Sequence, residues 1–203
     1  CSNQKISLIF ALSLKRNRSN ERFFLFSIAV NRYTGKISAA EKKLSSYEIN
    51  IFNTGCIIKT FGRGNSTVSA SISFYTPSEK PIGSYERAWH GSELNLECIV
   101  FTFKHGSIVF PYRLFSDKPE STGVLLFNMY SEKDYPAIYD YPFLPEEEKM
   151  SIKTLFKSAV FSPYLLTLFS SARLQTVTLA SFKPDAEYSL NILPSGQAVL
   201  EKL

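Results

Sequence analysis

The sequence lacks the residue patterns that most metal and cofactor sites need. It contains only two histidines and three cysteines, and no two cysteines are in a Cys-x-x-Cys pair, so no zinc-binding spacing is available. No alternating aspartate loop of the calcium-binding type occurs. The glycine turns TGKIS (34–38) and FGRG (61–64) do not fit the phosphate-binding pattern G-x-x-x-x-G-K-[ST]. The sequence therefore predicts no metal and no cofactor.

A long apolar run is also missing. No stretch reaches the roughly 20 apolar residues that a membrane-spanning helix needs. The longest apolar-rich stretch, ISLIFALSL at 6–14, is interrupted by serines and followed by the basic run KRNR. It is long enough for the core of a signal peptide, but no small-residue cleavage site follows it. Its alternation of large apolar residues favours a β-strand instead.

Acidic residues are scarce near the start of the chain. Residues 1–43 contain nine Lys and Arg against two Glu, a net charge of +7, which leaves −2 for the other 160 residues of a chain whose total is +5. Such a basic region next to a bilayer is attracted to anionic headgroups, by about 1 kcal/mol per well-placed cation. A nucleic-acid surface is a second interpretation, but no RNP-like, zinc-finger or helix-turn-helix pattern accompanies it, and we predict no nucleic-acid partner. Solvated strand ends and turns are the third interpretation.

What the sequence does contain is a pattern typical of β structure. Aromatic residues make up 14% of the chain, and they favour strands. Alternating apolar residues predict strands at 6–14, 22–30, 47–53, 56–61, 66–76, 94–103, 107–115, 123–131, 173–182, 187–193 and 197–202. Two Pro and two Gly predict a long loop over 77–93.

Helical patterns are few and mostly late in the sequence. Ser38 and Glu41 have the spacing of a capping box, which predicts a short helix that begins there. Pro145 and three glutamates begin a helix predicted over 145–160, and PYLLTLFSS predicts a second, short helix after it. We therefore predict a mainly β (α+β) fold, an antiparallel sandwich or open barrel with one or two late helices packed on it, in a single domain over 1–203.

Two cysteines lie inside predicted strands. A disulfide between Cys56 and Cys98 would close a loop of about 40 residues. Free, buried thiols are the alternative, because cysteine is among the most buried residue types. The sequence leaves both possibilities open.

The segment 130–148 is a candidate ligand-binding loop because tyrosines, aspartates and prolines alternate in it. A stiff aromatic loop with carboxylates could stack a sugar ring and accept its hydroxyls, or it could contact another protein. In the structural alternative, the tyrosines of a proline-stiffened connection cover the core. The candidate ligand-binding residues are Tyr130, Asp134, Tyr135, Tyr139, Asp140 and Tyr141.

The two histidines are weak catalytic candidates. His90, beside Trp89 and Glu93 in the predicted loop, could act as a general base. No G-x-S-x-G motif accompanies it, and His105 falls at a predicted hairpin tip that offers little shelter for catalysis. We therefore expect both to be ordinary turn histidines and predict no catalytic residue.

The first five residues, CSNQK, resemble the mature end of a bacterial lipoprotein. That resemblance implies a signal sequence removed just before Cys1, a diacylglycerol on its sulfur and often a third acyl chain on its amine. Each buried methylene adds about 0.8 kcal/mol of membrane affinity. In that family Ser2 fits sorting to the outer membrane, and residues 1–5 would act as the tether. A chain cut arbitrarily at a cysteine is the alternative.

Together these features predict a lipid-anchored, non-enzymatic protein of the cell envelope, with the outer membrane favoured. It would act as a binding or structural module, and its partners would be the membrane through the lipid anchor and an envelope protein or glycan. The alternative is an extracytoplasmic hydrolase or glycan-binding protein that uses His90 or the loop at 130–148.

Overall fold

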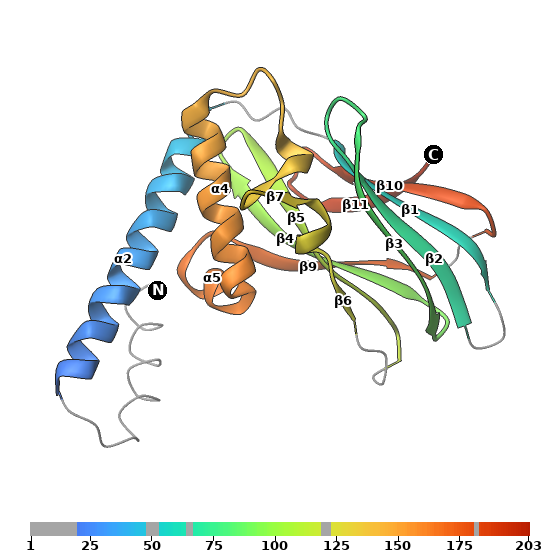
Figure 1. Cartoon of the computed structure of the whole chain (residues 1–203), viewed down its shortest axis with the longest axis horizontal. Coiled ribbons are helices and arrows are strands. Elements are labelled where there is room, and N and C mark those ends of the chain that lie inside the picture. Colours follow the sequence, from blue (N-terminus) through green and yellow to red (C-terminus); the bar gives the residue numbers. More distant parts are fainter. Residues whose placement is uncertain (1–19, 48–52, 64–66, 119–122, 181–182) are drawn as a thin grey trace.

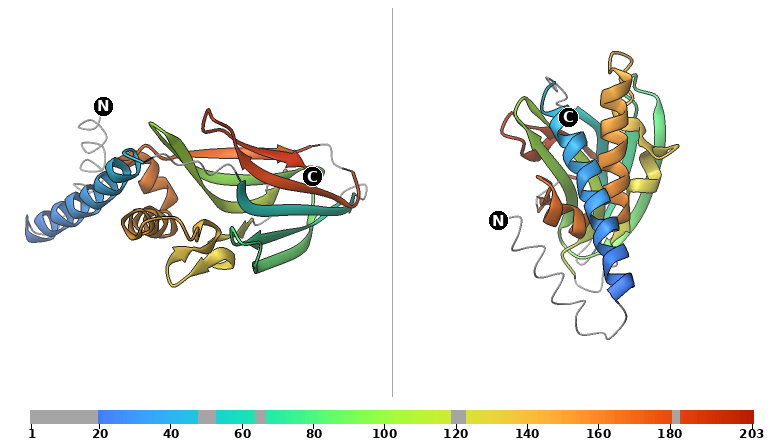
Figure 2. Two further views of the ribbon diagram at one scale, coloured as in Figure 1. Left: turned by 90° about the horizontal axis from the view of Figure 1, so that it is seen from above. Right: turned by 90° about the vertical axis from the view of Figure 1, so that its left-hand side faces the viewer.

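Two antiparallel sheets face each other, and the longer helices gather at one end of them (Figure 1). The computed structural model describes residues 20–47, 53–63, 67–118, 123–180 and 183–203. The two further views in Figure 2 show the same separation of helices from sheets. The predicted fold class, mainly β with antiparallel sheets that do not close into a barrel and late helices, is confirmed.

The larger sheet has five strands in the spatial order β11–β10–β1–β2–β3. In chain order these are β1 (Asn53–Arg63), β2 (Thr67–Tyr75), β3 (Pro81–His90), β10 (Ala186–Ile192) and β11 (Ala198–Lys202). Strand β2 shows the predicted alternation: Val68, Ala70, Ile72 and Phe74 are buried, and the serines between them face outward. This period-two burial is what a sheet with one covered face requires.

The smaller sheet has the order β6–β5–β4–β9. Its members are β4 (Leu94–Phe103), β5 (Gly106–Ser116), β6 (Val124–Leu125) and β9 (Arg173–Leu179). The predicted β4–β5 hairpin is confirmed, and both strands are buried along most of their length. Phe110 of β5 packs edge-on against Phe156 of the helix α4 (Glu146–Phe161), with ring centroids 5.4 Å apart. The helical layer therefore completes the core of this sheet.

The late helices agree with the prediction to within a residue or two. Helix α4 begins directly after Pro145 and carries three glutamates in its first turn, where they complement the helix dipole. The second helix, α5 (Pro163–Phe169), begins after Ser162, whose hydroxyl accepts a hydrogen bond from the Leu165 N–H. Pro163 occupies its first position, where no backbone N–H is needed.

The first described helix contradicts two predictions. Residues 22–30 were predicted as a strand and a short helix was predicted to start at Ser38, but one continuous helix, α2 (Asn20–Leu44), covers both. A continuous apolar run cannot be assigned to strand or helix by periodicity alone, and no proline interrupts this stretch. The periodic signal lies in its second half, where Ile37, Ala40 and Leu44 are buried.

Helices α2 and α4 run antiparallel, and they lie side by side in the right-hand view of Figure 2. Near the start of α4, Lys43 forms an ion pair with Glu147. Near its end, the Tyr33 hydroxyl donates to the Ser158 carbonyl at 3.3 Å. Contacts at both ends of α4 therefore hold the second half of α2 against it.

The predicted loop at 77–93 is wrong, because most of it forms β3, which pairs antiparallel with β2. Strand β3 lies at the edge of its sheet, so Pro81 at its first position costs no ladder hydrogen bond. Gly83 lies directly against the Met129 carbonyl oxygen, and a Cβ there would collide with it. The proline and glycine are thus features of an edge strand rather than markers of a loop.

The strand predicted at 123–131 is mostly wrong. Only β6 is extended, and the next residues form the short helix α3 (Phe127–Tyr130), which packs on β2, β3 and β5. A short hairpin, β7 (Ser131–Glu132) and β8 (Tyr135–Pro136), and a 3₁₀ turn, η1 (Ala137–Tyr139), connect it to α4. The aromatic side chains Phe127 and Tyr130 are both buried, and residues three positions apart lie on the same face of a helix. The prediction of a strand did not take this spacing into account.

Some predicted elements lie partly or wholly outside the described residues. They are the tether at 1–5, the strand at 6–14, most of the strand at 47–53, and the ends of the strands at 66–76 and 173–182. The sequence predicts either a hairpin or a bulge at Thr54-Gly55. Strand β1 begins at Asn53 and shifts register between Asn53 and Ile57, so the bulge is the alternative that the structure shows. The three final strands are confirmed, and residues 194–196 form the turn of the last hairpin, as their sequence Pro-Ser-Gly predicts.

Candidate functional site

The two aspartates of the 130–148 loop are paired with helix α4. Lys133 and Asp134 have positive φ angles of 50° and 64°, as the tight β7–β8 turn requires. The Asp134 carboxylate accepts a hydrogen bond from Lys157 at 3.0 Å, and this bond lowers the pKa of Asp134. Asp140 accepts one from Lys149 at 3.1 Å. Both aspartate carboxylates of the 130–148 loop therefore form ion pairs with lysines of α4.

Two of the tyrosines are structural. The Tyr139 hydroxyl, fully buried, accepts from the Val109 N–H at 2.9 Å and donates to the Val109 carbonyl at 2.7 Å. The Tyr130 hydroxyl, also fully buried, donates to the Pro111 carbonyl at 2.8 Å. Strand β6 pairs only with residues 113 and 114, so these hydroxyls bind β5 where β6 does not reach. Burial raises the pKa of both tyrosines, which keeps them protonated.

The other two tyrosines are half-buried and lie nearer the surface. The Tyr135 hydroxyl donates to the Tyr139 carbonyl at 2.8 Å, so it too holds the loop together. Tyr135 and Asp140 also border a shallow hollow against α4, together with Lys133, Lys149 and Lys153. Tyr141 lines a different recess, and burial raises its pKa.

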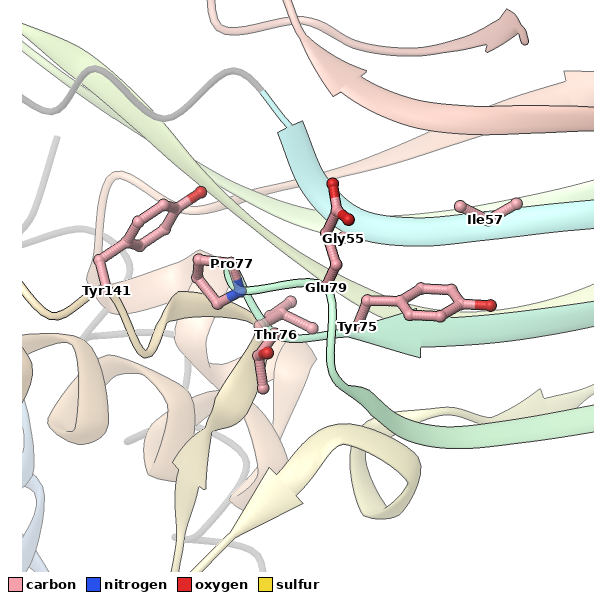
Figure 3. A pocket seen from close by; sticks show the side chains of 8 residues that line it. Gly55, Ile57, Tyr75, Thr76, Pro77, Glu79 and Tyr141 are labelled. Carbon is pink, nitrogen blue, oxygen red and sulfur yellow. The ribbon is translucent and has the colours of Figure 1, made fainter.

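That recess is the stronger of the two hollows as a candidate ligand site, because residues from three separate segments enclose it. It has a volume of about 440 Å³ and lies between the start of β1, the β2–β3 turn and η1. Figure 3 shows the Glu79 side chain extending toward β1 at Gly55, with Tyr141 on the other side of Pro77. The lining residues are Gly55, Ile57, Tyr75, Thr76, Pro77, Glu79, Ile138 and Tyr141.

The turn that carries Glu79 is held in shape by Thr76. The Thr76 N–H donates to the Lys80 carbonyl at 2.9 Å, and the Thr76 hydroxyl accepts from the Lys80 N–H at 3.1 Å. The Glu79 N–H donates to the Thr76 carbonyl at 2.9 Å, and Glu79 adopts a positive φ of 62°. The carboxylate is therefore presented to the recess from a closed, hydrogen-bonded turn.

Gly55 shapes the opposite wall. It has a φ of +61°, a conformation that favours glycine, and a Cβ at this position would collide with the Tyr75 carbonyl oxygen. The bulge at Gly55 thus allows β1 to approach the end of β2 closely. The recess was missed in the sequence because its residues come from three separate segments, although the Thr-Pro-Ser-Glu-Lys-Pro turn was a local signal.

His90 is not part of a catalytic group among the described residues. It ends β3 with an exposed side chain. The nearby Ser92 hydroxyl donates to Asp117 at 3.1 Å, and the same carboxylate accepts the N–H groups of Ser92 at 2.7 Å and Glu93 at 3.1 Å. These bonds, the one from the Glu93 backbone first, lower the pKa of Asp117 to about 2. The serine and the acid close a turn together, without the histidine.

None of the remaining candidates is a lining residue of the recess. His105 is exposed at the tip of the β4–β5 hairpin. Cys56 and Cys98 are both free and fully buried, one in each sheet, and burial raises the pKa of both thiols. Within the described ranges, no group of three His, Cys, Asp or Glu side chains could hold a metal ion.

No protein-family model, no curated protein and no solved structure matches the chain. In the part of the chain that the structure describes, no helix has both the length and the apolar character needed to cross a membrane.

Proposed function

We propose that this chain is a non-enzymatic binding module of the cell envelope, and that the recess beside Glu79 binds a ring-bearing ligand such as a sugar unit of an envelope glycan. The observation that carries the proposal is the recess itself. Its volume of about 440 Å³ lies in the range of small-molecule sites. It combines apolar and aromatic walls with a single carboxylate, the composition that such sites commonly have.

The recess has complementary groups for a sugar ring. Tyr75 and Tyr141 offer aromatic surface on which the C–H face of a sugar could pack. Glu79 is exposed, and an ionised carboxylate accepts hydrogen bonds from hydroxyl groups. The closed Thr76 turn fixes the backbone of Glu79 before a ligand arrives, and such preorganisation reduces the entropic cost of binding.

The hydrolase alternative has less support. Glycoside hydrolysis commonly uses a pair of carboxyl groups across the scissile bond. Among the described residues that line the recess, Glu79 is the single carboxylate. Asp134 and Asp140, the acids suggested by the sequence, are paired with lysines of α4 instead. The geometry therefore favours binding over cleavage.

A titration with a soluble N-acetylglucosamine tetramer, followed by heteronuclear NMR, tests the binding site. We expect the amide signals of the β2–β3 turn and of η1 to shift. The variants Tyr141→Ala and Glu79→Gln should each weaken binding by about tenfold, the loss expected for about 1.4 kcal/mol. Tyr164→Ala removes a tyrosine of α5 that is 57% exposed and should leave binding unchanged. Shifts scattered away from the recess, or equal binding by all variants, would contradict the proposal.

Attachment through acyl chains on Cys1 remains a prediction from the sequence, because the described residues begin at Asn20. Labelling cells with radioactive palmitate tests it directly. The mature protein should carry the label, and Cys1→Ser should abolish it. An unlabelled protein would remove the anchor but would leave the proposed ligand site intact, so the two parts can fail separately.

A further inference from the structure

The junction of α4 and α5 exposes a cluster of apolar side chains, here called the α4–α5 patch. Phe161 is 74% exposed and Tyr164 is 57% exposed. An exposed group of large apolar side chains is typical of a surface that binds a partner or a membrane. The patch consists of Val160, Phe161, Tyr164, Leu165 and Leu168. Residues 158–172 contain no charged side chain, although charged residues make up 20% of the chain.

Helix α2 places positive charge beside this patch. The Tyr33 ring lies 6.0 Å from the Phe161 ring, centroid to centroid. Arg32 and Lys36, one residue before and three residues after Tyr33, are exposed, and neither is in an ion pair with any described residue. By sequence, α2 carries five Lys and Arg against two Glu.

We propose that the α4–α5 patch is the face with which the folded body rests on an anionic lipid bilayer. Phe161, Tyr164, Leu165 and Leu168 enter the boundary between headgroups and acyl chains, where aromatic side chains such as tyrosine, with one polar end, are favoured. Arg32 and Lys36 contact the anionic headgroups. This inference extends the proposed function and rests on it for one point, the presence of a membrane next to the protein. It does not require an acyl chain on Cys1.

Charge favours a bilayer over a second copy of the chain. A symmetric dimer places the same surface of both copies face to face. A dimer through the α4–α5 patch would therefore bring two basic α2 helices together, and like charges across an interface oppose association. An anionic bilayer instead attracts the same cations. An anionic bilayer therefore matches both surfaces: its acyl chains match the apolar patch, and its headgroups match the basic helix.

Vesicle sedimentation tests the proposal with the full 203-residue chain carrying Cys1→Ser, which cannot be acylated on the thiol. We expect binding to vesicles of phosphatidylcholine with about 30 mol % phosphatidylglycerol, and weaker binding to phosphatidylcholine alone. Phe161→Ser should lower the partition coefficient about tenfold, as expected when one buried aromatic side chain is lost. Leu168→Ser should act in the same direction.

Phe143→Ser is the matched control. Phe143 is 72% exposed, almost as much as Phe161, but it precedes the other end of α4, about 24 Å away along a 16-residue helix. It should bind vesicles within twofold of the parent chain, and circular dichroism should show both variants folded.

Three results would overturn the proposal. They are no sedimentation with the anionic vesicles, equal losses for Phe143→Ser and Phe161→Ser, or a dimer in sedimentation velocity that Phe161→Ser dissociates. Because the chain carries Cys1→Ser, none of these results depends on whether the natural protein is acylated.

Discussion

Removing a single oxygen atom, with Tyr139→Phe, should destabilise the protein strongly. The Tyr139 hydroxyl is fully buried and bonds both the N–H and the carbonyl of Val109, at 2.9 and 2.7 Å. In the variant both backbone groups would lose this partner inside the core. Each buried polar group left unsatisfied costs about 1–3 kcal/mol, and the lower desolvation cost of phenylalanine offsets part of the total. We expect a net loss of about 3 kcal/mol in the free energy of unfolding.

Urea and thermal denaturation measure this loss. For a chain of this size, about 3 kcal/mol corresponds to a fall in Tm of roughly 6–12 °C. Tyr130→Phe removes one bond, to the Pro111 carbonyl, and should cost about 1 kcal/mol. Tyr164→Phe, at an exposed position, should stay within about 0.5 kcal/mol of the parent protein. If Tyr139→Phe and Tyr164→Phe have the same stability, the hydroxyl does not hold β5 and the argument fails.

Three further predictions concern the turn after β3, the thiols and the recess. Because the folded-state pKa of Asp117 is lowered to about 2, its contribution to stability should be complete above pH about 4 and disappear as pH falls toward 2. The NMR signals of the Ser92 and Glu93 amide protons, which donate to Asp117, should shift with that apparent pKa. A midpoint near pH 4 would show that these bonds do not stabilise the carboxylate. Cys56 and Cys98 should resist iodoacetamide at pH about 8 in the folded protein and react on unfolding, since burial raises both pKa values; rapid labelling of the native state would contradict this. Gly55→Ala should destabilise the fold by roughly 1–3 kcal/mol because of the positive φ and the collision with the Tyr75 carbonyl; an unchanged urea midpoint would show that the bulge can relax.

Most of the strands and both late helices could be predicted because their signals are local. The serine alternation of 66–76 and the proline and glutamates of 145–148 each specify one structure without reference to distant residues. The first described helix could not be predicted, because Phe, Leu, Ile and Val in an unbroken run are compatible with both strand and helix. Its second half packs against α4, and the contacts at Tyr33 and Lys43 join residues more than 100 positions apart, which a local pattern does not reveal.

The candidate site also depends on contacts between residues that are far apart in the sequence. The loop at 130–148 is rich in tyrosine, but its composition is compatible with two roles: tyrosines that bind a ligand, and tyrosines that pack on the core. The structure assigns Tyr130 and Tyr139 to support, and it leaves Tyr141 at a recess with residues from β1 and the β2–β3 turn. A spacing along the chain could not have indicated that grouping.

The support role of the two tyrosines has a consequence for the proposed ligand site. On the side away from β4, none of the described strands pairs with β5 at Val109 and Pro111. A backbone carbonyl or N–H buried there without a partner would be costly. The hydroxyls that fill this role belong to α3 and η1, so the segment between them is fixed at both ends by the core. Tyr141 follows the second of these fixed points by two residues, and its N–H donates to the Tyr139 carbonyl at 2.8 Å. The recess wall that Tyr141 provides is therefore anchored to β5, so Tyr139→Phe should loosen the recess as well as the fold.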